Sequence, residues 1–144
     1  MTTVSKKILI VDDEKSLREI MKKRLGKLGY DPECAKNGKE GLEISERKKF
    51  PLILLDLRMP EMDGIELCIR IKERNPETVI YAFSGIVTEV ELELLEEIGF
   101  DGLLCKPFTF EVLGRAIEGA FEKINKRREK SCPHPFAVLK GTYR

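Results

Sequence analysis

Short runs of consecutive apolar residues alternate along this chain with longer segments in which apolar residues recur every three or four positions. Consecutive apolar residues are typical of strands buried on both faces of a sheet, whereas the three-to-four spacing predicts helices with one apolar stripe. Ile8–Val11 and Leu52–Leu55 are two such runs, and Thr78–Phe83 is a third that is β-branched and aromatic. We therefore predict three central strands at these positions.

Two weaker strands complete the predicted sheet. The segment from Tyr30 to Ala35 is extended but contains Pro32, which lacks the N–H that a central strand donates. We expect this strand at an edge of the sheet. A brief strand around Leu103 to Cys105 comes shortly after Gly99.

The first three predicted helices follow the first three strands. The first ends at Gly29, the second covers residues 39–48, and the third runs from Gly64 to Arg74 before Asn75-Pro76. The expected inner face of the first helix is Leu17, Ile20, Met21, Leu25 and Leu28, and that of the third is Leu67, Cys68 and Ile71.

Two further helices follow the last two strands. Thr88 and Glu91 form the capping-box pattern that starts a helix, and Thr109 is a suitable first cap for the final one. The expected inner faces are Leu94, Leu95 and Ile98 in the fourth helix, and Leu113, Ala116, Ile117, Ala120, Phe121 and Ile124 in the fifth.

Five strands alternating with five helices predict the α/β class, with a parallel sheet between two helical layers. A length of 144 residues suits one domain, and 42% hydrophobic with 35% charged residues is typical of a globular chain. No apolar run is long enough to span a bilayer, and residues 1–7 do not resemble a signal peptide. We accordingly expect a cytoplasmic protein.

The cysteines and the single histidine suggest little chemistry. Cys34, Cys68, Cys105 and Cys132 include no C-x-x-C pair, so reduced thiols are a better interpretation than zinc ligands. His134 lies between two prolines near the chain end, and we expect a surface residue there.

Charge is unevenly distributed along the chain. Residues 126–144 hold six Lys or Arg and one Glu, leaving 20 bases and 24 acids in residues 1–125. We interpret 126–144 as a basic C-terminal tail without an effector domain. A short basic segment is more often a solvated helix end than a nucleic-acid surface, so we expect no direct DNA binding.

Polar residues follow several predicted strands at the point where each strand ends. Asp12 and Asp13 follow the first strand, Asp56 the third, Ser84 the fourth and Lys106 the fifth. Ligands of open parallel sheets bind at these carboxyl ends. Clustered carboxylates suit Mg²⁺, which prefers oxygen ligands together with phosphate oxygens. Asp56 could then attack phosphorus, with the Ser84 hydroxyl and Lys106 ammonium holding phosphoryl oxygens.

Structural interpretations of the same residues exist. Asp12, Asp13 and Glu14 could simply be acids favoured at a helix N-terminus, Ser84 part of an ordinary loop, and Lys106 a surface lysine. Asp63-Gly64 is interpreted as a turn and helix start. We favour the functional interpretation, because five polar residues with unrelated structural roles would otherwise have to occur at strand ends by chance.

Several segments resemble the receiver domain of bacterial two-component response regulators. They are Ile8 to Glu14, the D-x-x-M-P-x-M-D-G pattern that begins at Asp56, Ser84-Gly85, and Lys106-Pro107-Phe108. The resemblance covers residues 6–125, which we take as the receiver domain. It implies a flavodoxin-like fold of five βα units with strand order 2-1-3-4-5, and a cis Lys106-Pro107 peptide.

The resemblance also implies a function. Asp56 would accept a phosphoryl group from a sensor histidine kinase or a histidine phosphotransfer protein. Asp12, Asp13, Asp56 and the main-chain carbonyl of Arg58 would bind Mg²⁺ or Mn²⁺, and Ser84 and Lys106 would bind the phosphoryl group. The result would be a signalling phosphoprotein, rather than an enzyme, that switches a downstream protein through the surface of the fourth helix, fifth strand and fifth helix. Whether it also drives homodimer formation stays open.

One position departs from the family pattern. An aromatic residue commonly stands three positions before the lysine and swings inward on phosphorylation, but here that residue is Leu103. A pseudo-receiver, which keeps the fold as a phosphorylation-independent interaction module, is therefore an alternative. An aspartyl-phosphate phosphatase is disfavoured, because such an enzyme needs a second aspartate as acid and base two residues after Asp56, and Arg58 stands there. A dinucleotide-binding enzyme is also disfavoured, because the first strand is followed by acids and not by G-x-G-x-x-G.

Overall fold

The computed structural model describes residues 5–85, 87–129 and 136–139, so Cys132 and His134 lie outside the described residues. The strands are β1 (Lys7–Val11), β2 (Asp31–Ala35), β3 (Leu52–Asp56), β4 (Val79–Ser84), β5 (Gly102–Cys105) and β6 (Ala137–Leu139). The helices are α1 (Lys15–Lys27), α2 (Gly38–Arg47), α3 (Gly64–Arg74), α4 (Glu89–Ile98) and α5 (Phe110–Glu129).

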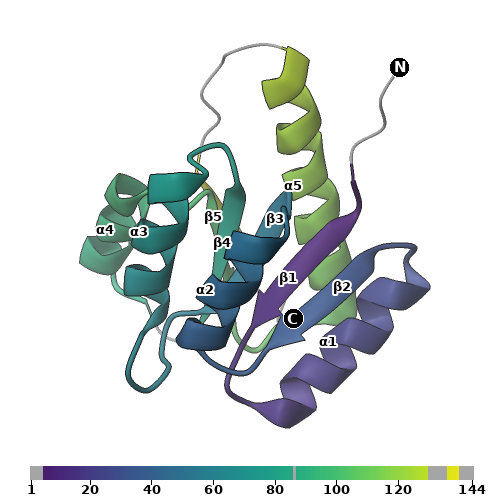
Figure 1. The fold of residues 1–144 in the computed structure, drawn as a ribbon, viewed down its shortest axis with the longest axis horizontal. Coiled ribbons are helices and arrows are strands. Elements are labelled where there is room, and N and C mark those ends of the chain that lie inside the picture. The colour runs from purple at the N-terminus through teal and green to yellow at the C-terminus, as the bar shows by residue number, and fades with distance from the viewer. Residues whose placement is uncertain (1–4, 86, 130–135, 140–144) are drawn as a thin grey trace.

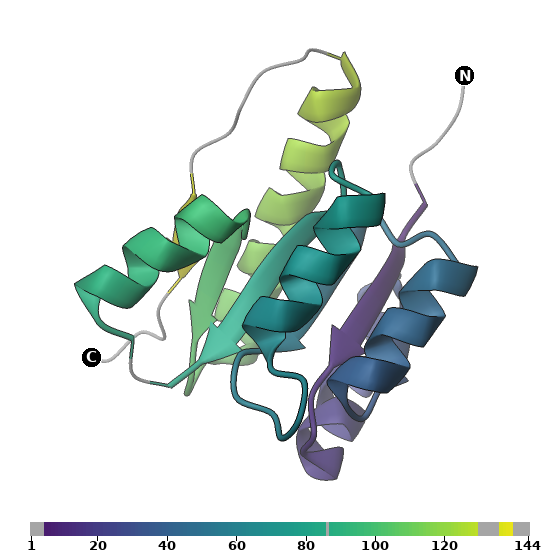
Figure 2. The ribbon, with the colours of Figure 1, turned by 60° about the vertical axis from the view of Figure 1, so that its left-hand side comes forward.

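All strand pairs are parallel, and the sheet has the order β2-β1-β3-β4-β5-β6. The predicted order of the first five strands is confirmed, and Pro32 lies in β2 at one edge as expected. The sixth strand was not predicted. It extends the sheet beyond β5 at the opposite edge, where it is the yellow strand in Figure 2.

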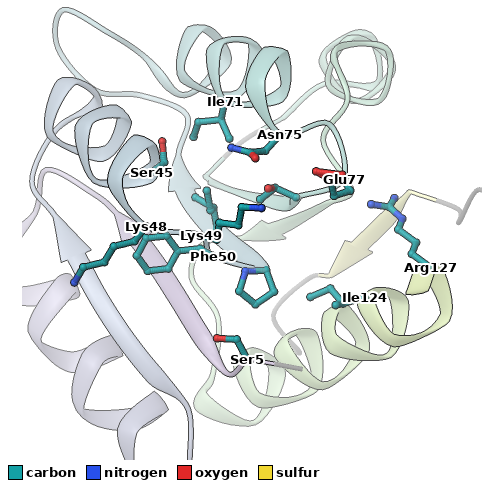
Figure 3. Close-up of a pocket in the computed structure, with 13 residues that line it drawn as sticks. Ser5, Ser45, Lys48, Lys49, Phe50, Ile71, Asn75, Glu77, Ile124 and Arg127 are labelled. Carbon is teal, nitrogen blue, oxygen red and sulfur yellow. The ribbon is translucent and has the colours of Figure 1, made fainter. Parts of the chain in front are cut away.

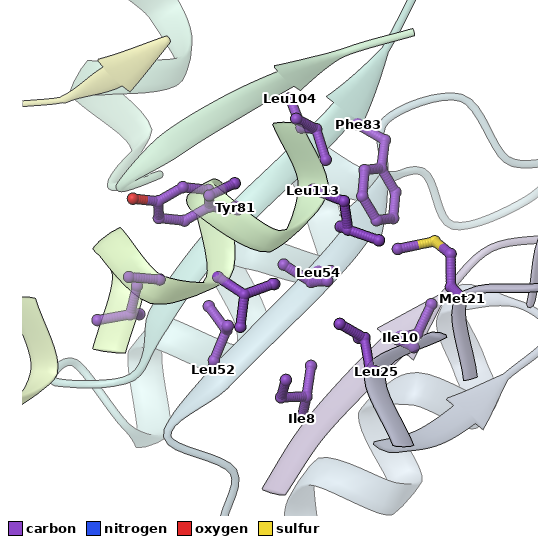
Figure 4. Close-up of a cluster of buried hydrophobic side chains, with 14 of the residues drawn as sticks. Ile8, Ile10, Met21, Leu25, Leu52, Leu54, Tyr81, Phe83, Leu104 and Leu113 are labelled. Carbon is purple, nitrogen blue, oxygen red and sulfur yellow. The ribbon is translucent and has the colours of Figure 1, made fainter. Parts of the chain in front are cut away.

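Helices cover the sheet on both faces (Figures 1 and 2). α1 and α5 pack on one face, where the sheet contributes residues such as Ile8, Leu54 and Phe83 to the core shown in Figure 4. α2, α3 and α4 pack on the other face, against residues such as Leu9 and Leu55. The strands are therefore apolar on both faces because each face has its own core, and burying one Leu or Ile side chain contributes about 1.5–3 kcal/mol.

The predicted helix starts are confirmed by their capping hydrogen bonds. Thr88 and Glu91 form a reciprocal capping box at α4. Oγ1 of Thr109 accepts from the Val112 N–H at the start of α5, and the Asp63 carboxylate accepts from the Glu66 N–H at the start of α3. These bonds satisfy N–H groups that lack a partner inside the helix.

The expected inner faces need three corrections. Met21 and Leu25 are buried, but Ile20 in α1 is 47% exposed and Leu28, just after the helix, is 55% exposed. In α4, Leu95 is buried whereas Leu94 is 44% exposed. Neighbouring positions on a helix are about 100° apart, so a stripe of adjacent apolar residues is wider than the surface that the sheet can cover.

The segment predicted as a tail also differs from expectation. Residues 126–129 continue α5, and Ala137–Leu139 form β6. Among the described residues, no helix combines the length and the apolar character needed to span a membrane.

Candidate functional site

The residues predicted from strand ends meet at the carboxyl edge of the sheet. Asp12 follows β1, Asp56 is the last residue of β3, Ser84 is the last of β4, and Lys106 follows β5. Asp12, Asp56 and Ser84 are all buried, with exposed fractions of 0%, 6% and 2%. Parallel pairing in register places these ends side by side, because β1, β3, β4 and β5 are consecutive neighbours in the sheet.

Asp12 is fixed by contacts to both carboxylate oxygens. Its Oδ1 accepts a hydrogen bond from the Glu14 N–H at 2.8 Å, and its Oδ2 lies 3.4 Å from Nζ of Lys106. Arg18 donates to the main-chain oxygen of Asp12 at 2.8 Å. A buried carboxylate needs such partners in place of water, and together they hold the Asp12 side chain in one orientation.

The Asp56 carboxylate has two donors close to it. Oδ1 accepts from the Arg58 N–H at 3.2 Å, and Oδ2 lies 3.7 Å from Nζ of Lys106. Burial is the largest influence on this group and raises the pKa of Asp56 above its usual value. The Arg58 N–H and Lys106 oppose that rise in pKa, whereas the nearby Asp12 and Asp13 add to it. A further cation beside this partly desolvated carboxylate would stabilise its charged form.

The three aspartates form a group that could hold a metal ion. Asp12, Asp13 and Asp56 each offer a carboxylate oxygen, and these atoms lie within 4.8 Å of one another. The donor set consists of oxygen only, which suits a hard divalent cation such as Mg²⁺. Asp13 is exposed while the other two are buried, so the group opens to solvent on one side.

The Ser84 hydroxyl is buried without a partner. Its Oγ has no hydrogen bond, and it is the one such buried side-chain atom found among the described residues. A buried hydroxyl without a partner costs about 1–3 kcal/mol, and such groups in native proteins usually have a reason. An oxygen-rich ligand beside Asp56 would supply the missing partner.

Lys106 is placed by the end of β5. Its main-chain N–H donates to the Ser84 oxygen at 2.7 Å, which ties the two strand ends together. The Lys106-Pro107 peptide is cis, as predicted. Phe108 then stacks on Phe83 with ring centroids 5.8 Å apart, and the Lys106 ammonium lies 5.9 Å from the Phe83 ring centre. The Lys106 ammonium therefore lies near the Phe83 ring and close to the carboxylates of Asp12 and Asp56.

The loop after β3 is pressed against the end of that strand. A side chain at Gly64 would collide with the main-chain oxygen of Asp56, and its Cβ would come within 2.8 Å of Leu55 Cδ1. Only glycine therefore fits at the start of α3. The preceding Asp63 caps this helix, so the structural interpretation of Asp63-Gly64 is confirmed.

Arg58 makes two contacts near the site, and its predicted role as a metal ligand through the main-chain carbonyl stays a prediction. The contacts that the structure shows are its N–H to Asp56 and an ion pair between its Nη2 and Oε2 of Glu91 at 3.6 Å. This exposed pair joins the site loop to α4. The sequence did not predict the contacts of Glu91 and Arg18 with site residues. Glu91 was assigned only to the capping box, and an arginine near a helix start has no distinctive pattern.

A separate cavity of about 510 Å³ lies at the opposite, amino edge of the sheet (Figure 3). Its lining includes Phe50, Ile71 and Ile124 with Lys49 and Arg127, and it contains none of the predicted site residues. This cavity is therefore separate from the group of carboxylates at the strand ends.

Comparisons with known proteins agree with this geometry. The family model described as response regulator receiver domain matches residues 8–118. The chain is 33% identical over 130 residues to the alkaline phosphatase synthesis transcriptional regulatory protein PhoP of Bacillus subtilis, covering 90% of this chain and 52% of that protein. It is 38% identical over 110 residues to the autoinducer 1 sensor kinase/phosphatase LuxN of Vibrio harveyi, covering 76% of this chain and 13% of LuxN. The chain thus spans about half of the first relative and a small part of the second.

Solved structures have the same fold. A CheY-like response regulator receiver domain protein from Methanospirillum hungatei aligns with a TM-score of 0.82 at 28% identity, covering 86% of this chain and 99% of that one. The beryllofluoride-activated NtrC4 receiver domain dimer aligns with a TM-score of 0.78 at 33% identity, covering 83% and 98%. β6 lies beyond the residues that the family model matches.

Proposed function

Because this chain belongs to the response regulator receiver domain family, we propose that Asp56 accepts a phosphoryl group and that the phosphorylated chain changes its protein partner. The donor would be a sensor histidine kinase or a histidine phosphotransfer protein. The observation that carries the proposal is the position of the Asp56 carboxylate, between Lys106 and the group of Asp12 and Asp13.

The transfer step follows from the charges at the site. An oxygen of Asp56 forms a bond to phosphorus while the bond from phosphorus to the donor nitrogen breaks, and the histidine leaves with the electron pair. The Lys106 ammonium neutralises a phosphoryl oxygen, and the Ser84 hydroxyl donates to another. Asp12, Asp13, Asp56 and the Arg58 carbonyl would hold Mg²⁺ or Mn²⁺, which would neutralise charge on the phosphoryl oxygens when bound.

The signal would leave the site through Ser84. A phosphoryl group on Asp56 offers the unpaired hydroxyl an acceptor, and movement of the Ser84 hydroxyl toward it would shift the loop that leads into α4. Leu103 is buried at 1% exposure in β5, so a swinging aromatic side chain is not the second half of this switch.

The surface of α4, β5 and α5 is the proposed output. On α4, Val90 and Leu94 are 75% and 44% exposed and lie one helical turn apart. Exposed apolar side chains in this arrangement fit a protein partner better than nucleic acid, whose binding needs clustered positive charge. We propose a downstream protein as the target, in the cytoplasm.

The chain would act as a substrate of its kinase and not as an enzyme on other molecules. Its own residues would still promote two reactions, namely phosphorylation from small phosphodonors and hydrolysis of the acyl phosphate. Both use the same Lys106 and carboxylate group, so neither needs a further site.

The test is incubation with acetyl phosphate and Mg²⁺ followed by intact-mass measurement. The proposal predicts one phosphoryl adduct that disappears when a chelator is present. If neither acetyl phosphate nor any histidine kinase produced an adduct, the pseudo-receiver function would replace it. That second candidate is favoured by one observation, the buried Leu103 at the position of the usual switch residue.

A further inference from the structure

The cavity at the amino edge of the sheet has no part in the proposed function (Figure 3). Its volume of about 510 Å³ falls within the range of roughly 300–1,000 Å³ that is usual for small-molecule sites. Its walls come mainly from the segments that lead into β3 and β4 and from the last part of α5. The cavity therefore lies at the end of the sheet remote from Asp56, between parts of the chain that are far apart in sequence.

The inner wall of this cavity is apolar. Phe50, Ile53 and Ile71 belong to the core beneath α2, α3 and α4, whereas Ile124 belongs to the core beneath α1 and α5. Pro51, which is half-buried, also lines the cavity. An apolar group placed here would contact the ends of both cores, and its removal from water would favour binding.

Hydrogen bonds to the main chain hold the rim of the cavity. The Val79 N–H donates to the Pro51 oxygen at 3.1 Å, which joins the segments before β3 and β4. The Thr78 N–H donates to the Asn75 oxygen at 3.1 Å, and Nζ of Lys72 donates to the Thr78 oxygen at 2.7 Å. A ligand would therefore enter a site whose backbone is already fixed, without the cost of ordering a loop.

The charged residues around the cavity favour an anion. Three bases and one acid line it, namely Lys48, Lys49, Arg127 and Glu77. Lys48 pairs with Glu33 at 2.9 Å. Arg127 pairs with Asp101 at 2.6 Å. The Lys49 ammonium has no hydrogen bond or ion pair among the described residues. Figure 3 shows Lys48 pointing away from the cavity and Lys49 pointing into it, so Lys49 supplies the available positive charge.

Two neutral polar side chains of the lining are available as well. The Asn75 amide and the Thr78 hydroxyl face no hydrogen-bond partner in the part of the chain that the structure describes. Figure 3 shows Asn75 beside Ile71 at the edge of the apolar wall. An amide N–H and a hydroxyl can both donate to a carboxylate. The lining thus combines an apolar wall with one cation and two neutral donors.

We propose that this cavity binds a small amphipathic anion, a molecule with an apolar chain or ring and one carboxylate. The apolar part contacts Phe50, Ile53 and Ile124, and the carboxylate pairs with Lys49 and accepts from Asn75 or Thr78. A mostly apolar lining with a few polar groups that fix orientation is the usual composition of a small-molecule site. This inference does not depend on phosphoryl acceptance by Asp56.

Octanoate is a suitable probe, because it combines one carboxylate with an apolar chain, and octanamide is its neutral control. NMR of the full chain, isotopically labelled at the isoleucine δ1 methyl groups, locates the bound molecule. Ile53, Ile71 and Ile124 report on the cavity. Ile10 is the reference, since it is buried in β1 and does not line the cavity.

A matched pair of lysine substitutions tests the charge. Lys49→Gln removes the cation assigned to the carboxylate. Lys39→Gln removes the same charge from a lysine outside the cavity lining. Both lysines are exposed, and neither forms an ion pair within residues 5–85, 87–129 and 136–139, so both variants should fold as wild type does.

We expect octanoate to shift the three cavity methyl signals in a saturable way and to leave Ile10 unchanged. Octanamide should bind wild type about fivefold more weakly, and octanoate should bind Lys49→Gln about fivefold more weakly, as for loss of a partly exposed ion pair. Lys39→Gln should bind octanoate as wild type does.

Absence of a saturable shift at the cavity methyl groups would overturn the site. Equal affinity of wild type for octanoate and octanamide would overturn the anionic ligand. So would an affinity for octanoate that is unchanged in Lys49→Gln, or that falls equally in Lys49→Gln and Lys39→Gln.

Discussion

Nζ of Lys106 lies 3.4 Å from Oδ2 of Asp12 and 3.7 Å from Oδ2 of Asp56, so one ammonium group pairs with two buried carboxylates from different strands. The lysine side chain is 29% exposed, which keeps its head partly hydrated. It compensates carboxylates that would otherwise repel each other, and it stands where the proposed phosphoryl transfer would need positive charge.

Removing this ammonium should destabilise the fold. Lys106→Met keeps the apolar stem but leaves Asp12 and Asp56 without their shared cation, and we expect a loss of about 2 kcal/mol in the free energy of unfolding. In a double-mutant cycle with Asp12→Asn, the two losses should not add, with a coupling of about 1 kcal/mol. Urea denaturation of the four proteins measures this, and additive losses would show that the pair is not coupled.

Ser84→Ala should separate stability from function. The hydroxyl is buried without a partner, so its removal should raise the free energy of unfolding by about 1 kcal/mol or more, while phosphorylation by acetyl phosphate becomes slower. Ser45→Ala is the control, because Ser45 Oγ donates to the Leu42 oxygen at 2.8 Å away from the site. That variant should lose about 1 kcal/mol and keep its phosphorylation rate. Equal rates for both variants would contradict the role given to Ser84.

Arg58→Ala should change the lifetime of the acyl phosphate. The side chain is exposed and pairs with Glu91 on α4, and the Arg58 N–H donates to Asp56, so we expect this side chain to affect how readily water reaches an acyl phosphate on Asp56. Arg70→Ala is the matched control, since Arg70 forms a comparable pair with Glu66 on α3. Decay of the phosphorylated protein, followed by mass measurement, should differ for Arg58→Ala only. A lifetime equal to that of wild type would contradict this role.

Tyr81→Phe should alter stability at alkaline pH. Burial, and next the nearby Asp101, raise the pKa of Tyr81 from 10.0 to about 12, against a smaller opposing influence of Arg127. Since the folded-state pKa lies above the unfolded one, the stabilising contribution is fully present below pH 10 and is lost as pH rises toward 12. Between these limits wild type should lose roughly 2 kcal/mol more than Tyr81→Phe. Chemical denaturation of both proteins across this pH range measures the difference in the free energy of unfolding. An equal dependence on pH in the two proteins would contradict a buried, neutral Tyr81 hydroxyl.

The site was predictable because each of its residues follows an apolar run. Once Ile8–Val11 and Leu52–Leu55 are parallel strands, their ends must share one edge, and Asp12 and Asp56 come together without any detailed geometry. The contacts at that edge were not predictable. Whether Lys106 reaches one carboxylate or two, and whether the Ser84 hydroxyl has a partner, depends on side-chain rotamers that spacing does not encode.

The sequence did not predict β6, and the physical reason is a different one. A strand of three residues, Ala137–Leu139, is shorter than any pattern window, and its stability comes from Gly102 and Asp101 on a distant part of the chain. The exposure of Ile20 and Leu94 has a similar origin. Which side of a broad apolar stripe faces the sheet is decided by tertiary packing and not by the local sequence.

The most direct measurement of the central claim compares Asp56→Asn with Asp63→Asn after incubation with acetyl phosphate and Mg²⁺. Both changes replace a carboxylate with an amide, and asparagine caps a helix about as well as aspartate, so Asp63→Asn should leave α3 intact. Intact mass should show one phosphoryl adduct in wild type and Asp63→Asn and none in Asp56→Asn. An adduct that persists in Asp56→Asn would contradict Asp56 as the acceptor.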